Sequence, residues 1–216
     1  ISKFYMKWAI VIISIITLIV GLYLIFSVFQ KEIFKLLIFL FLGIGCIIAA
    51  IKYTIGKSAY GYKAYGDLSV FIFFGMVGVI GSYYLFTKNF HWITVPGALF
   101  TGLMSCGVLN LNNMRDYEND KKNNKITLVV KMGINKSKKY HFLLLFIAIS
   151  SLITIVLFTN NYYYIFSILP LVFVLRHLKL LNKYQDMKLL DSQLKVIAIS
   201  CFGCSFISLI VGLLIN

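Results

Sequence analysis

Apolar residues in this chain form long continuous runs, which are separated by short polar stretches. Each run has roughly the 20 residues that an α-helix needs to cross a bilayer. The runs are too long for strands, and open strands cannot cross lipid. The predicted fold is therefore an all-α, polytopic membrane helix bundle. We predict seven spanning helices, at about 5–29, 33–52, 67–87, 92–112, 139–159, 162–181 and 194–215.

The composition agrees with a membrane protein. Of the 216 residues, 60% are hydrophobic and only 13% are charged, whereas a soluble domain carries about 25% charged residues. A secretory signal peptide does not explain the apolar composition, because apolar runs recur along the whole chain. We predict one membrane-embedded domain over residues 1–216, with two longer polar connections at 53–66 and 113–138.

Basic residues are divided unequally between the two sides of the predicted bundle. With seven spans, the N-terminus and the connections after the second, fourth and sixth spans share one side, which carries 18 of the 21 Lys and Arg residues. The other side carries only Lys31, Lys35 and Lys88. The positive-inside rule therefore places the first side in the cytoplasm. This topology also explains the net charge of +14 without a nucleic-acid partner.

Six of the seven acidic residues lie on the same predicted cytoplasmic side. Among them, Asp116 and Asp120 follow an apolar run and are four residues apart, so on a helix they share one face. Carboxylates at a membrane are costly unless they are paired, hydrated or bound to a cation. Mg²⁺ prefers one or two carboxylates together with substrate phosphates. We therefore predict that Asp116 and Asp120 bind Mg²⁺ and a phosphorylated substrate.

Polar neighbours extend this candidate site. Asn112 lies one turn before Asp116, and the cations Arg115 and Lys125 suit phosphate oxygens. The 53–66 connection adds lysines and tyrosines on the same side. The alternative is an ordinary solvated loop in which acids and lysines offset each other. For the tyrosines the alternative is an interfacial aromatic belt.

Two further groups of residues have simpler interpretations. Three glycines recur at every third position of the third span and predict a close helix-packing face: Gly75, Gly78 and Gly81. Three histidines stand apart near span ends, and we interpret them as interfacial residues that bind no ligand: His91, His141 and His177.

The 112–133 segment resembles the second aspartate-rich motif of the UbiA superfamily of intramembrane prenyltransferases. Its pattern N-N-x-R-D-x-x-x-D-x-x-x-x-K-x-T-L-x-V-x-x-G is most similar to that of the 1,4-dihydroxy-2-naphthoate polyprenyltransferases. The matching residues are Asn112, Asn113, Arg115, Asp116, Asp120, Lys125, Thr127, Leu128, Val130 and Gly133. The 53–84 stretch is similar as well, although the family often has Glu at the position of Asp67.

The resemblance implies transfer of a polyprenyl group from polyprenyl diphosphate to dihydroxynaphthoate, with decarboxylation, to give demethylmenaquinone. It implies a Mg²⁺-dependent site at the cytoplasmic face of a bacterial plasma membrane. Asp116 and Asp120 would bind the metal, and they would act in catalysis together with Lys125. Substrate-binding roles would fall to Asn112, Asn113, Arg115, Lys57, Lys63, Tyr62 and Asp67.

The family also has nine spanning helices and a first aspartate-rich motif, and nothing like that motif occurs here. We therefore expect that this chain lacks the first two helices and is inactive by itself. One alternative is a prenyltransferase for another acceptor, such as 4-hydroxybenzoate or haem. Another is a seven-span transporter or receptor without chemistry. The position of the acids at one membrane face argues against the transporter, because a transport site lies near the middle of the bilayer.

Overall fold

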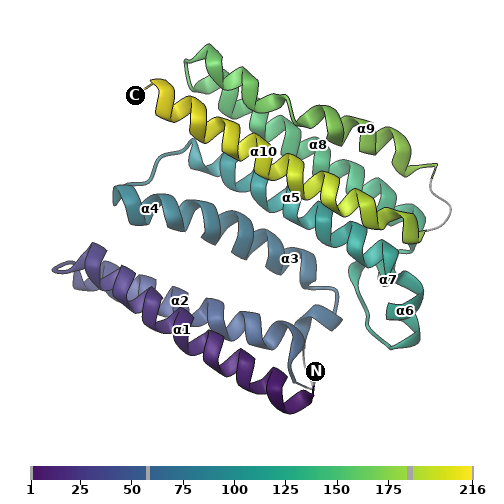
Figure 1. Ribbon diagram of the computed structural model, residues 1–216, viewed down its shortest axis with the longest axis horizontal. Coiled ribbons are helices and arrows are strands. Elements are labelled where there is room, and N and C mark those ends of the chain that lie inside the picture. Colours follow the sequence, from purple (N-terminus) through teal and green to yellow (C-terminus); the bar gives the residue numbers. More distant parts are fainter. Residues whose placement is uncertain (1, 57–58, 184–186, 216) are drawn as a thin grey trace. The chain divides into compact units, whose positions relative to one another are not determined.

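A computed structural model of the protein describes residues 2–56, 59–183 and 187–215. Lys57, one of the predicted substrate-binding residues, lies outside the described residues. The chain divides into two compact units, Ile1–Ala59 and Tyr60–Asn216 (Figure 1).

The first unit is a hairpin of two apolar helices, α1 (Lys3–Phe29) and α2 (Ile33–Thr54). The Ser2 hydroxyl caps α1 by accepting a hydrogen bond from the backbone N–H of Tyr5 at 3.5 Å. Next to the turn, the buried Phe29 ring packs on Phe39 with 5.0 Å between the ring centroids. Most other large apolar side chains of both helices are exposed, as helices that face lipid require.

The second unit is also helical. One span is built from α3 (Gly66–Val70), η2 (Phe71–Gly81), which has wider π-type turns, and α4 (Ser82–Thr87). The long helices are α5 (Thr94–Arg115), α8 (Ile134–Phe158) and α10 (Asp191–Ile215). Pro170 separates η3 (Tyr162–Ile168) from α9 (Leu171–Leu181). The short helices are η1 (Tyr60–Tyr62), α6 (Tyr117–Lys122), α7 (Leu128–Met132) and η4 (Met187–Leu190).

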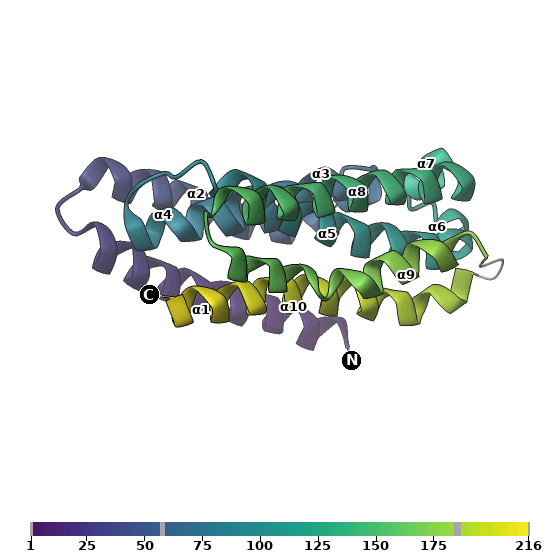
Figure 2. The same cartoon turned by 90° about the horizontal axis from the view of Figure 1, so that it is seen from above.

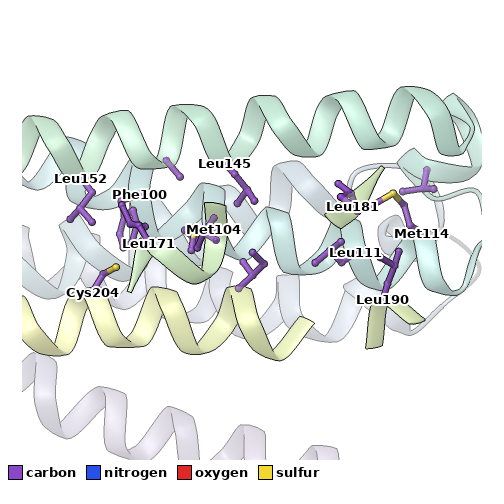
Figure 3. Close-up of a cluster of buried hydrophobic side chains, with 14 residues drawn as sticks. Phe100, Met104, Leu111, Met114, Leu145, Leu152, Leu171, Leu181, Leu190 and Cys204 are labelled. Atoms are coloured by element: carbon purple, nitrogen blue, oxygen red, sulfur yellow. The ribbon is translucent and has the colours of Figure 1, made fainter. Parts of the chain in front are cut away.

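The central helix of the second unit is α5, which packs against η2, α8 and α10. Its inward face contributes Met104, Leu111 and Met114 to the buried core, which also contains Leu145 of α8 and Cys204 of α10 (Figure 3). These side chains are fully buried. Because the core holds α5 nearly to its end, the acidic segment that follows α5 begins from a fixed position.

Seven helices of the described residues are long and apolar enough to cross a membrane, which confirms the predicted fold class. Their bounds are Phe4–Phe29, Ile33–Thr54, Gly66–Thr87, Thr94–Arg115, Ile134–Phe158, Tyr162–Leu181 and Met187–Ile215. The polar 113–138 connection is more ordered than a loop, because it contains α6, α7 and the start of α8. Within the described ranges, the one β-type pairing is an isolated bridge between Lys63 and Ile126.

The predicted glycine packing face is present at one of its three positions. A Cβ atom added to Gly75 would lie 2.7 Å from the carbonyl oxygen of Ala98 and 2.9 Å from the Cα atom of Gly102. Both contacts are with the backbone of α5, which cannot rotate away. At Gly81 the nearest atom is a side-chain carbon of Val77, at 3.9 Å. Gly75 therefore allows η2 and α5 to approach closely, as small residues do between membrane helices.

We expect the Gly75→Ala substitution to lower the free energy of unfolding by about 1–3 kcal/mol, the usual cost of overpacking. Gly81→Ala is the matched control on the same helix, and it should be neutral or slightly stabilising because alanine favours helices over glycine. Thermal unfolding of both variants in the same detergent measures the difference. Equal unfolding midpoints would show that η2 and α5 do not meet at Gly75.

Candidate active site

The polar end of α5 continues directly into α6. The backbone N–H of Asp116 donates to the carbonyl of Asn112 at 3.0 Å, and the N–H of Asp120 donates to the carbonyl of Asp116 at 2.8 Å. These bonds place the three residues one helical turn apart, as their spacing predicts. The segment lies at the same end of the second unit as the beginnings of α3, α8 and α10 (Figures 1 and 2).

Arg115 connects three oxygen-bearing side chains at this end of the unit. Its Nε donates to Oδ1 of Asp116 at 2.9 Å, and its Nη2 donates to Oδ2 at 3.0 Å. The same Nη2 donates to Oδ1 of Asn112 at 2.8 Å, and Nη1 donates to Oδ1 of Asp191 at 2.6 Å. The planar guanidinium matches the carboxylate in a two-point contact. Both oxygens of Asp116 therefore have a cationic partner.

Asp120 has a cationic partner of its own. The Nζ atom of Lys125 lies 3.1 Å from each of its carboxylate oxygens. The backbone N–H of Lys125 also donates to the carbonyl of Asp120 at 2.9 Å, which closes the loop that carries the lysine. Asp120 is only 4% exposed. A carboxylate so deeply buried is stable only with a nearby positive charge.

The two polar connections meet beside Lys125. The backbone N–H of Ile126 donates to the carbonyl of Tyr62 at 3.2 Å, next to the bridge between Lys63 and Ile126. The ammonium of Lys125 lies 5.9 Å from the centre of the Tyr62 ring, within the range of a cation–π contact. Lys63 is exposed on the same short stretch. Tyr62 and Lys63 thus come close to Lys125, which lies more than 60 positions further along the chain.

Asp67 lies deeper in the unit, at the start of α3. It is 6% exposed, and its carbonyl accepts a hydrogen bond from the thiol of Cys106 at 3.2 Å. The hydroxyl of Tyr140 interacts with its carboxylate. Within the described part of the chain, the Oδ1 atom has no hydrogen-bond partner. A buried acid in a membrane-spanning segment marks a candidate functional site.

The hydrogen bonds from Arg115 hold the pKa of the Asp116 carboxyl below its ordinary value of 3.8, and the charge of Lys125 acts in the same direction. Because the folded-state pKa is lowered, the pair stabilises the fold above the ordinary pKa. This contribution is lost as the pH falls through the lowered value. At neutral pH Asp116 is therefore an anion that can exchange one cationic partner for another.

Two carboxylates alone do not enclose a metal ion. Among the described residues, no group of three or more His, Cys, Asp or Glu side chains is placed to hold one. Asp116 and Asp120 nevertheless fit Mg²⁺, which takes one or two carboxylates and fills its other positions with phosphate oxygens and water. Their present partners are flexible side chains that can move aside. The residues thus fit two ligands of a metal that also holds a diphosphate.

Some buried polar residues were missed or misread from the sequence. Asn113, a predicted substrate-binding residue, is 4% exposed, and Asn110 is fully buried on the same helix. His141 and His177 are 0% and 1% exposed, and their Nε2 atoms lie 3.0 Å apart. Our interpretation of these two histidines as isolated interfacial residues was wrong. The packing of α8 against α9 brings them together, which one helix alone does not reveal.

Comparison with known proteins places this geometry in a family. Residues 6–199 match the UbiA prenyltransferase family. The chain belongs to this family. The motif of Asp116 and Asp120 on α5 and α6, and most of both units, therefore lie within its UbiA region.

Curated relatives in the UbiA family are named for prenyl transfer. The chain is 40% identical over 148 residues to 1,4-dihydroxy-2-naphthoate octaprenyltransferase of Haemophilus influenzae, which covers 68% of this chain and 48% of the relative. It is 44% identical over 120 residues to the Escherichia coli enzyme of that name, covering 56% and 38%. A Drosophila melanogaster UbiA prenyltransferase domain-containing protein 1 homolog is 31% identical over 102 residues, covering 47% and 28%.

The chain spans about half or less of the length of these relatives. No solved structure gives a significant match. The geometry of the motif therefore comes from this structure alone.

Proposed function

We propose that this chain forms the active-site region of a 1,4-dihydroxy-2-naphthoate polyprenyltransferase of menaquinone biosynthesis. The names of its bacterial relatives support the donor and the acceptor. The observation that carries the proposal is the pair Asp116 and Asp120, one turn apart, each hydrogen-bonded to its own cation. Such a pair is suited to bind a metal and an anionic substrate together.

In this proposal, Asp116 and Asp120 would hold Mg²⁺, and the bound ion would supply positive charge for the leaving diphosphate. Lys125 is the catalytic lysine. A rotation of its side chain moves its ammonium from Asp120 to a diphosphate oxygen. Lys63 adds positive charge from the facing connection. Asn112 orients Arg115 by accepting a hydrogen bond from its Nη2 atom.

The proposed reaction breaks the allylic carbon–oxygen bond of the polyprenyl diphosphate, and diphosphate leaves with the bonding electrons. The ring carbon that bears the carboxylate forms the new carbon–carbon bond. The carboxylate then leaves as CO₂, and its bonding electrons return to the ring. This gives the reduced form of demethylmenaquinone. The surrounding helices exclude water from the allylic cation.

The acceptor is proposed to lie between Tyr62 and Asp67. The unpartnered Oδ1 of Asp67 is an acceptor for a phenolic hydroxyl, and a buried acceptor without a partner is costly. Tyr62 is 41% exposed, and its aromatic ring can stack on a flat aromatic molecule. The adjoining Tyr140 hydroxyl interacts with Asp67 and would orient its carboxylate.

The chain is a multi-pass membrane protein. We propose that it lies in a bacterial plasma membrane with the site toward the cytoplasm, because the motif shares its side with 18 of the 21 basic residues. The bilayer supplies the polyprenyl donor. The positive charge lies between the spans, so we propose no nucleic-acid partner.

We expect the full-length gene product in membrane vesicles to convert dihydroxynaphthoate and a polyprenyl diphosphate into a prenylated product that lacks the carboxylate. Mass spectrometry of the lipid extract measures this product, and chelation of divalent cations should abolish it. The matched control replaces dihydroxynaphthoate with 4-hydroxybenzoate. Prenylation of 4-hydroxybenzoate in preference to dihydroxynaphthoate would contradict the proposed acceptor.

A further inference from the structure

Arg115 bridges two carboxylates that are far apart in the sequence. Its Nε and Nη2 atoms bind the two oxygens of Asp116, and its Nη1 binds Oδ1 of Asp191 at 2.6 Å, the shortest of its contacts. Asp191 lies 76 residues further along the chain and begins α10. It lies outside the aspartate-rich motif of residues 112–133.

A second set of hydrogen bonds holds the first turn of α10, which carries Asp191. Two residues further along α10, the Oε1 atom of Gln193 lies 2.8 Å from Nδ1 of His177. An amide oxygen only accepts, so Nδ1 of His177 carries the hydrogen. For neutral rings, the Nε2 atom of His177 then accepts from Nε2 of His141 at 3.0 Å. The first turn of α10 is therefore tied to α9 and α8 as well as to Arg115.

The contacts of Arg115 affect how Asp116 can bind a metal ion. Each oxygen of the Asp116 carboxylate accepts a hydrogen bond from Arg115, so the guanidinium competes with a metal ion for the same carboxylate and must release at least one oxygen before Asp116 can bind a metal through both. A guanidinium released at the membrane edge would keep the neutral Oδ1 of Asn112 as an acceptor, but without a second anionic acceptor it would lose much of its stabilisation. Asp191 provides that acceptor, already within hydrogen-bonding distance on the opposite edge of the guanidinium.

We infer that Asp191 is a positioning residue for the metal site: it retains Arg115 while Asp116 exchanges the guanidinium for a divalent cation. The inference rests on the proposed function, in which Asp116 is a metal ligand. Without Asp191, Asp116 is the one carboxylate among the described residues to which Arg115 is hydrogen-bonded. The guanidinium then competes more strongly with the metal for the same two oxygens.

The test is the affinity of the chain in lipid nanodiscs for Mn²⁺ in the presence of inorganic pyrophosphate, measured by electron paramagnetic resonance of free Mn²⁺. Asp191→Asn should weaken binding by roughly two- to fivefold, the scale of a partly exposed charge pair. Asp191→Glu keeps the charge and should bind like the wild type. Ser205→Ala is the control on the same helix, because its hydroxyl donates to the carbonyl of Cys201 away from this network, and it should also leave the affinity unchanged.

A double-substitution experiment separates positioning from a general effect on folding. In an Arg115→Gln background, Asp191→Asn should cause no further loss, because the residue acts through Arg115. An equal loss in both backgrounds would overturn the inference, since Asp191 would then act directly as a ligand or only through the fold. If the wild type binds Mn²⁺ and Asp191→Asn binds it equally well, the positioning role of Asp191 is overturned, while the proposed metal site stands. No Mn²⁺ binding by the wild type would overturn the proposed metal site as well.

Discussion

Replacing Asp116 by asparagine is expected to reduce prenyl transfer by the full-length gene product by at least about a hundredfold. This is the scale on which loss of one group that stabilises transition-state charge acts. Asparagine keeps the size of the side chain and can still accept a hydrogen bond from Arg115. It loses the negative charge that a divalent cation requires. The measurement is the initial rate of product formation at saturating Mg²⁺, with protein level checked in the same membranes.

Glu118→Gln is the matched control for this substitution. Glu118 lies on α6 between the two aspartates, is exposed, and also loses one negative charge. It should retain nearly the wild-type rate. If Glu118→Gln and Asp116→Asn reduced the rate equally, the effect would come from the charge of the segment. If Asp116→Asn retained full activity, Asp116 would not be a metal ligand.

Replacing Lys125 by methionine should have two effects that can be separated. The buried carboxylate of Asp120 would lose its cationic partner, and breaking a buried pair on one side costs about 3–5 kcal/mol of folding free energy. The diphosphate would also lose a positive charge. We therefore expect a lower unfolding midpoint in detergent and a strongly reduced rate of prenyl transfer.

The Asp120→Asn/Lys125→Met double variant distinguishes the two effects. Because it removes both charges, it should recover most of the stability that Lys125→Met alone loses. It should remain inactive, because neither the metal ligand nor the diphosphate contact returns. A double variant that regained both stability and activity would show that the pair has only a structural role. Lys125→Arg keeps the charge and should remain folded.

The sequence was sufficient to predict the helical membrane fold and the region of the site. Spanning helices have long apolar runs whatever their neighbours are, so all seven could be found by length alone. The spacing of Asp116 and Asp120 also predicted that they lie one turn apart, because that relation is local to one helical segment. The basic residues around Lys125 could also be identified, because they are close to the two aspartates in the sequence.

The partners of these residues could not be predicted, because they depend on how helices pack. Arg115 reaches Asp191 across 76 residues, and no local pattern indicates which acid it contacts. The contact between His141 and His177 could not be predicted for a similar reason. The two histidines lie on different helices, and each alone looks like an ordinary residue near the end of a span. Asn110 could have been identified from the sequence, since an amide within an apolar helix is costly to bury unless it is hydrogen-bonded.

The central claim is that Asp116 and Asp120 bind diphosphate through a divalent cation. Its most direct test is calorimetric titration of inorganic pyrophosphate into the chain in nanodiscs, with Mg²⁺ or with a chelator. We predict binding that requires Mg²⁺, is weakened at least about tenfold by Asp116→Asn, and is unchanged by Glu118→Gln. Pyrophosphate binding of equal strength without Mg²⁺, or in Asp116→Asn, would contradict the claim.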